Sequence, residues 1–122
     1  MCIRDRRNDE SLKELYICDL GLNKKNESDF VELLTQLRKR SVKIAYIDHH
    51  DLDKKIIKQL EKVKVKVVHD TNECASVQVY DTYKKKLDDH AAFIAACAAI
   101  TDYMKIDLLV QNFFRYLIDN LH

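Results

Sequence analysis

The stretch VKIAYIDHH, residues 42–50, decides the fold of this chain. Its first six residues form a short apolar run that predicts a buried strand, and the polar residues that follow end it. Two similar runs, Leu15 to Cys18 and Val63 to Val68, predict two further strands. Because lysines alternate with valines in the run from Val63 to Val68, we expect this strand to have one exposed face and to lie at an edge of the sheet.

Segments with helical periodicity separate the three predicted strands. Asp29 to Arg40 follows Ser28, a candidate N-cap, and Asp51 to Lys62 places apolar residues on one face and lysines on the other. Alternating strands and helices predict a parallel sheet with helical crossovers. The fold class is therefore α/β, a parallel sheet with flanking helices. The C-terminal part is expected to be helical, at Glu73 to Leu87, Asp89 to Tyr103 and Asp107 to Leu121.

The composition limits the class of protein. A chain of 122 residues suffices for one α/β domain. With 21 basic and 20 acidic residues the net charge is +1, so the chain as a whole has no electrostatic attraction toward nucleic acid or a membrane. No apolar run approaches the roughly 18 residues of a membrane span. The four cysteines lie far apart without a C-x-x-C pair, so we expect reduced, mostly buried thiols in a cytoplasmic protein.

Both ends of the chain suggest a partial sequence. Residues 1–6, MCIRDR, resemble the translation of a transposon end used to build sequencing libraries, and we interpret them as a non-native scar. Near the C-terminus the helical pattern continues to the last residues without a stop signal. We therefore expect residues 12–122 to be part of a larger domain.

Residue types that bind metals follow every predicted strand. The carboxyl ends of parallel strands meet at one edge of the sheet, where ligands bind in open parallel sheets. Imidazole with carboxylate suits manganese, iron or zinc, and carboxylate-rich sets favour manganese or magnesium. The sequence therefore predicts a metal site at this edge, with candidates Asp19 after the first strand, Asp48, His49 and His50 after the second, and His69 and Asp70 after the third.

Several of these residues also have a purely structural interpretation. Asp19 taken alone would more often be a turn residue, and Asp70 could cap the helix that follows it. Two adjacent histidines are harder to explain in this way, because a sheet gains nothing from them. Asp102 follows the apolar stretch Ala91 to Ile100, so its carboxylate faces either the site or the solvent.

The segment YIDHH, residues 46–50, resembles the motif that names the DHH phosphoesterases. That family includes exonucleases, oligoribonucleases, manganese pyrophosphatases and exopolyphosphatases. The segment ICDL, residues 17–20, is similar to its second motif, and AAITD, residues 98–102, to its fourth, although Ala98 and Tyr103 replace the family's glycine and threonine. The resemblance extends over most of the chain, from about residue 13 to residue 104.

This resemblance implies two-metal hydrolysis with manganese, or magnesium. Asp19 would bridge two ions, His49 and Asp102 would ligate one of them, His50 would face the substrate phosphate, and Asp48 would orient the site. The family's first motif, a strand followed by His-x-Asp-x-Asp, supplies most ligands of the other ion, and nothing before Asp19 matches it. The glycine-rich domain that selects the substrate is missing too, so we expect the parent protein to be the active form.

The implied reaction is hydrolysis of a phosphodiester or phosphoanhydride, with a nuclease-type phosphodiesterase favoured. The implied partners are a phosphorylated small molecule or a short or single-stranded nucleic acid, and no membrane. Lysine clusters at Lys54-Lys55 and Lys84 to Lys86 could attract phosphates, although solvated helix faces are the commoner reason for them. Two alternatives stay open, a non-catalytic DHH-like scaffold and an unrelated α/β domain with a single structural metal.

Overall fold

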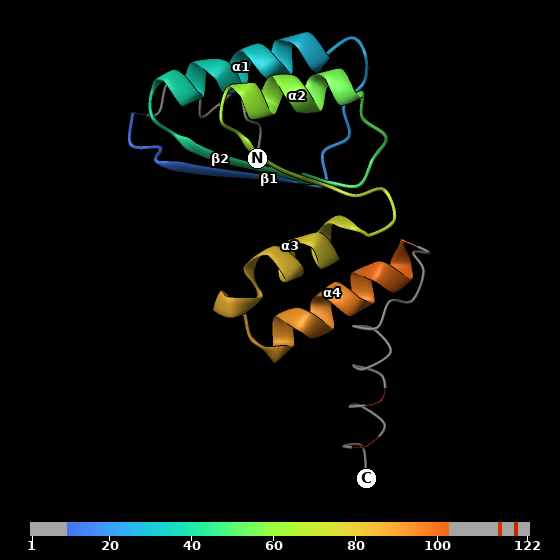
Figure 1. The fold of residues 1–122 in the computed structure, drawn as a ribbon. Coiled ribbons are helices and arrows are strands. Elements are labelled where there is room, and N and C mark those ends of the chain that lie inside the picture. Colours follow the sequence, from blue (N-terminus) through green and yellow to red (C-terminus); the bar gives the residue numbers. More distant parts are fainter. Residues whose placement is uncertain (1–9, 103–114, 116–118, 120–122) are drawn as a thin grey trace. The chain divides into compact units, whose positions relative to one another are not determined.

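The computed structural model describes residues 10–102, together with Arg115 and Asp119. This chain divides into two compact units, which meet in the sequence between His69 and Asp70. Figure 1 shows both units.

The first unit is a three-stranded parallel sheet with two helices, which confirms the predicted α/β fold class. Its elements are β1 (Glu14–Cys18), α1 (Glu27–Lys39), β2 (Lys43–Asp48), α2 (Lys54–Lys62) and β3 (Lys66–His69). The strands lie in the order β1-β2-β3, all parallel, so β3 is at an edge as its lysines predicted. The two helices lie side by side on one face of the sheet (Figure 1).

Large apolar side chains fill the space between this sheet and its helices. Phe30, Leu34 and Leu37 come from α1, and Leu60 from α2. They pack against Tyr46 of β2, whose buried ring meets the Phe30 ring edge-on with 5.5 Å between centroids. Burying one such side chain contributes about 1.5–3 kcal/mol, so this cluster anchors the strands whose ends carry the predicted site.

The second unit packs two helices through small side chains. It comprises α3 (Ala75–Tyr83), a 3-10 turn η2 (Lys84–Lys86) and α4 (Asp89–Thr101). The residues buried between the helices are Cys74, Val77, Ala95, Ala96 and Ala99. The helix predicted at Glu73 to Leu87 therefore starts later and ends in a 3-10 turn. The one predicted at Asp107 to Leu121 lies outside the described residues, except for Arg115 and Asp119, which are helical.

Helix starts and one strand start differ from the sequence prediction. Ser28 is not an N-cap, because α1 already begins at Glu27 and its N-cap residue is Asn26. The helix α2 begins at Lys54 because the Asp53 carboxylate accepts a bond from the Lys55 backbone N–H at 2.8 Å. The third strand is shorter than predicted, because the chain turns through a left-handed residue at Lys64, with φ 63°, before it enters the sheet.

Two further expectations concern the cysteines and the membrane. Of the described cysteines, which are all free thiols, Cys74 is buried, whereas Cys18 and Cys97 are exposed, so the prediction of mostly buried thiols is wrong. Partial burial raises the pKa of Cys18, and the neighbouring Asp19 charge raises it further.

Among the described residues, no helix has the length and apolar character that a membrane span requires.

Candidate functional site

Asp19 lies where the chain leaves β1. Its backbone N–H still donates to the Ile47 carbonyl oxygen at 3.0 Å, which continues the sheet pairing by one residue. Its φ of 56° then places it in the left-handed region, which Asp tolerates better than most residues. The side chain remains 60% exposed. The turn therefore leaves a carboxylate accessible at the carboxyl edge of the sheet.

His49 lies directly after β2, next to this carboxylate. Its Nε2 is 3.1 Å from Asp19 Oδ1, and its side chain is only 16% exposed. Asp19, His49 and His50 each offer one ligand atom, and these atoms all lie within 4.8 Å of one another. The structure thus brings together three of the residues that the sequence predicted for the metal site.

His50 is held by the buried carboxylate of Asp48. Asp48 Oδ1 accepts a hydrogen bond from His50 Nδ1 at 2.8 Å, and Oδ2 accepts one from the His50 backbone N–H at 3.2 Å. Because an ionised carboxylate can only accept, this pairing keeps a proton on Nδ1. In the neutral ring the second nitrogen, Nε2, is then the one that carries a lone pair. Asp48 therefore holds the His50 ring in a fixed orientation.

Two residues that the sequence analysis did not select complete this arrangement. The Tyr46 hydroxyl lies 2.8 Å from the Leu20 carbonyl oxygen and 3.2 Å from Asp48 Oδ2. Burial raises the pKa of Tyr46, and the Asp48 charge and hydrogen bond raise it further. Gly21 lies so close to the His50 ring that a Cβ there would be 3.1 Å from Cγ. The sequence alone could have pointed to Gly21, because it is the single glycine of the chain and lies two residues after Asp19.

His69, the last residue of β3, and Asp70, which follows it, do not belong to the group of three. His69 Nε2 lies 2.6 Å from the His50 backbone oxygen, and since that oxygen can only accept, Nε2 donates. Asp70 forms a local turn, because its Oδ1 accepts from the Asn72 backbone N–H at 2.8 Å. The next helix has Cys74 as its N-cap, so Asp70 does not cap it.

Asp102 belongs to the second unit. It is exposed at the C-cap of α4, and its backbone N–H donates to the Ala98 carbonyl oxygen at 3.0 Å. Its role as a metal ligand stays a prediction. Of the residues before Asp102, Ala99 is buried in the core between α3 and α4, whereas Ile100 is 42% exposed.

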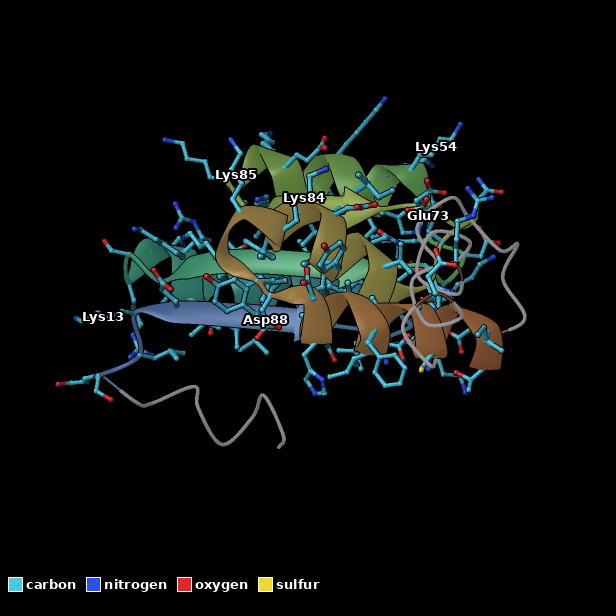
Figure 2. All side chains as sticks on the ribbon, turned by 90° about the horizontal axis from the view of Figure 1, so that it is seen from below. Lys13, Lys54, Glu73, Lys84, Lys85 and Asp88 are labelled. Carbon is cyan, nitrogen blue, oxygen red and sulfur yellow. The ribbon has the colours of Figure 1, made fainter. Side chains whose placement is uncertain are left out.

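The lysine clusters lie on exposed helix surfaces. Lys54 and Lys55 are exposed in the first turn of α2, and Lys84, Lys85 and Lys86 are exposed in η2. Figure 2 shows the Lys54 side chain at the end of its helix, pointing away from the fold. This placement agrees with solvated helix faces.

The donor set fits one divalent ion with an open coordination sphere. In an octahedral site with bonds of about 2.1 Å, neighbouring ligand atoms are about 3 Å apart. The observed 3.1 Å between His49 Nε2 and Asp19 Oδ1 matches that spacing. To act as a ligand, Nε2 must carry no proton, so the proton of the neutral ring would lie on Nδ1. The remaining positions would be left to water or substrate, as in catalytic rather than structural sites.

The sequence also contains one His-x-Asp-x-Asp string, which runs from His49 to Asp53. It follows β2, at the position of the DHH segment itself. Its last carboxylate is used as the cap of α2. This string therefore does not supply a second set of ligands in the arrangement observed.

Comparison with known proteins adds no relative to this picture. No family model matches the chain, and no match was found among curated proteins or solved structures. The similarity to DHH phosphoesterases therefore stays a resemblance carried by the residues themselves.

Proposed function

We propose that this chain is part of a metal-dependent phosphoesterase that hydrolyses a phosphodiester or phosphoanhydride. The observation that carries the proposal is the meeting of Asp19, His49 and His50, with ligand atoms within 4.8 Å, at the carboxyl edge of a parallel sheet. Such edges are where open α/β sheets bind their ligands. A nuclease-type phosphodiesterase in the cytoplasm is the form that we favour.

In this proposal, Asp19 and His49 hold a divalent ion, manganese or magnesium. The bound ion would supply an activated water and offset the charge that grows on the phosphate oxygens. Asp19 is 60% exposed, which leaves room for substrate beside it. His49 is nearly buried and therefore restrained, as a ligand that sets the position of an ion should be.

His50 acts on the substrate rather than on the ion. Its Nδ1 is engaged by Asp48, so Nε2 is the atom that faces a phosphate. When the ring is protonated, this nitrogen donates a charge-assisted hydrogen bond to a phosphate oxygen. The buried Asp48 carboxylate, 2.8 Å from Nδ1, holds the ring in place for this contact.

A complete two-ion site needs more ligands than this group of three offers. The two-ion scheme that the resemblance implies would use Asp19 for both ions and a carboxylate from Asp102, and it would need further ligands from another segment of the parent protein. We therefore expect this chain to bind one ion weakly and to hydrolyse phosphoesters no faster than background. A non-catalytic DHH-like scaffold remains the alternative, and phosphate binding separates the two.

The test measures Mn²⁺ binding to the chain by calorimetry or electron paramagnetic resonance. His49→Ala should lower the affinity by about tenfold or more, as expected for a lost ligand or its support. Asp102→Ala should lower it less, because Asp102 is exposed at a helix end. His90→Ala, which removes an exposed histidine of the second unit, is the matched control and should change nothing.

Orthophosphate binding then tests the catalytic form of the proposal. With Mn²⁺ present, phosphate should bind to the wild-type chain, and His50→Ala should weaken that binding. Phosphate binding that ignores both Mn²⁺ and His50 would favour the scaffold. A chain that binds no Mn²⁺ at all would refute the metal site.

A further inference from the structure

The loop after β1 is joined to the Asp48–His50 pair by two contacts outside the group of three. At the first, the Tyr46 hydroxyl lies 2.8 Å from the Leu20 carbonyl oxygen and 3.2 Å from Asp48 Oδ2. At the second, the Gly21 backbone lies against the His50 ring. The loop that carries Asp19 is therefore connected to His50 from two sides.

We propose that Tyr46 and Gly21 are positioning residues that fix the His50 ring relative to Asp19, a role that rests on the proposed function of the site. The Tyr46 side chain is fully buried, with its ring against Phe30. The position of its hydroxyl is thus set by the core. Its single proton is shared between two acceptors, the Leu20 carbonyl oxygen at 2.8 Å and Asp48 Oδ2 at 3.2 Å, so one hydroxyl restrains the loop through Leu20 and the imidazole through Asp48.

The Asp48 carboxylate transmits this restraint. Its Oδ2 receives the Tyr46 hydroxyl and the His50 backbone N–H, which leaves Oδ1 directed at His50 Nδ1. Removal of the hydroxyl would leave a buried carboxylate oxygen with one partner fewer, and the carboxylate would rotate to recover it. The ring would follow, because Nδ1 is bonded to the same group. Loss of the phenol oxygen should therefore appear at the imidazole.

Gly21 acts by leaving space. Glycine is not required here for an unusual backbone conformation, since no described glycine has a positive φ. It is required because a Cβ would lie 3.1 Å from His50 Cγ and 3.2 Å from Cδ2. An alanine would push the ring or the loop by a few tenths of an ångström. The His50 ring therefore occupies space that a side chain at residue 21 would fill.

The experiment reads the ring position directly by nuclear magnetic resonance in the metal-free chain. The wild type should show a nuclear Overhauser effect between the Gly21 Hα protons and the His50 ring. Tyr46→Phe should weaken or abolish it, while circular dichroism confirms that the variant is folded. Tyr16→Phe removes an exposed hydroxyl, bonded to Glu14, from the same sheet and should leave the signal unchanged. An unchanged signal in Tyr46→Phe would overturn the role of Tyr46.

Gly21→Ala provides the second arm, in a double-variant cycle with His50→Ala. The fold-change in phosphate affinity in the presence of Mn²⁺ should be on the order of tenfold in the wild-type background, as for other supporting groups. It should vanish in the His50→Ala background, where the added Cβ meets no ring. Equal effects in both backgrounds would overturn the role of Gly21.

The two proposals fail in different ways. A chain that binds no Mn²⁺ defeats the proposed function, whereas the ring signal in the metal-free protein still decides whether Tyr46 positions His50. The positioning role alone fails if the chain binds Mn²⁺ but Tyr46→Phe leaves the ring signal unchanged and Gly21→Ala has equal effects in both backgrounds.

Discussion

The first unit, residues 10–69, builds its core from large side chains, whereas the second, residues 70–102, builds its core from small ones. Tyr46, Leu34 and Leu60 are fully buried in the first. In the second, the cluster consists of Cys74, Val77 and three alanines of α4. Because apolar stabilisation scales with buried area, the first unit contributes most of it among the residues that the structure describes. The candidate site therefore stands on a core of large, closely packed side chains.

The same contrast separates the predicted site residues. His49 and His50 of the first unit are restrained by hydrogen bonds to Asp19 and Asp48. Asp102 of the second unit lies exposed at the end of a helix. A ligand at a strand end inherits the order of the sheet, while a ligand at a helix end depends on how that helix is anchored. Variants that perturb one unit at a time can test this difference.

The largest expected effect is from Leu34→Ala in the first unit. Leu34 has no exposed surface, and truncation of a buried leucine typically costs about 2–5 kcal/mol. The free energy of unfolding from urea titration, followed by circular dichroism, should fall by that amount. In the second unit, Val77→Ala removes two buried carbons and should cost only about 1.5 kcal/mol.

Leu87→Ala is the control for the same measurement, because Leu87 is exposed and should change the free energy by no more than about 0.5 kcal/mol. If Val77→Ala cost as much as Leu34→Ala, the two units would be equally well packed. The contrast drawn from their cores would then be wrong.

The sheet could be predicted from sequence because each strand is a short apolar run and the runs alternate with helical segments. The edge that carries the site could be predicted because the carboxyl ends of parallel strands meet at one edge of a sheet. The apolar runs placed β1 and β2 within one residue of their observed bounds. The left-handed residue at Lys64, which shortens β3, could not be predicted, since φ there depends on how α2 meets the sheet. Tyr46 and Gly21 were missed for a related reason. Their contacts join segments distant in sequence, and only the packed structure shows them.

A smaller effect is expected for Tyr46→Phe as a function of pH. Burial, with the Asp48 charge and hydrogen bond, raises the pKa of Tyr46 above its ordinary value, so the folded state resists ionisation. An unfolded tyrosine loses its proton near pH 10. The stabilisation is therefore complete below about pH 10 and is lost as the pH rises from there toward the raised pKa of the folded state.

The measurement compares the free energy of unfolding at neutral pH and at a pH above 10. Tyr46→Phe should be less stable by about 1–3 kcal/mol at neutral pH, because the Leu20 and Asp48 acceptors lose a donor. It should also lose less stability than the wild type at alkaline pH. Tyr16→Phe should keep the wild-type alkaline loss, since Tyr46 is still present. An equal loss in Tyr46→Phe would show that other groups cause it.

The smallest effect compares one interaction that occurs in both units, an aspartate that caps a helix. Asp53 accepts from the Lys55 N–H at 2.8 Å in the first unit, and Asp88 accepts from the Ala91 N–H at 3.0 Å in the second. Replacing either by alanine should cost about 1 kcal/mol, and Asp88→Asn, which keeps a capping oxygen, only a few tenths. Native-state hydrogen exchange should show that Asp88→Ala accelerates exchange of α4 amides by roughly fivefold while β2 amides keep their rates, since the less stable unit opens on its own. Equal acceleration of α4 and β2 amides would mean that the units open together, and the difference between their cores would then have no separate effect on stability.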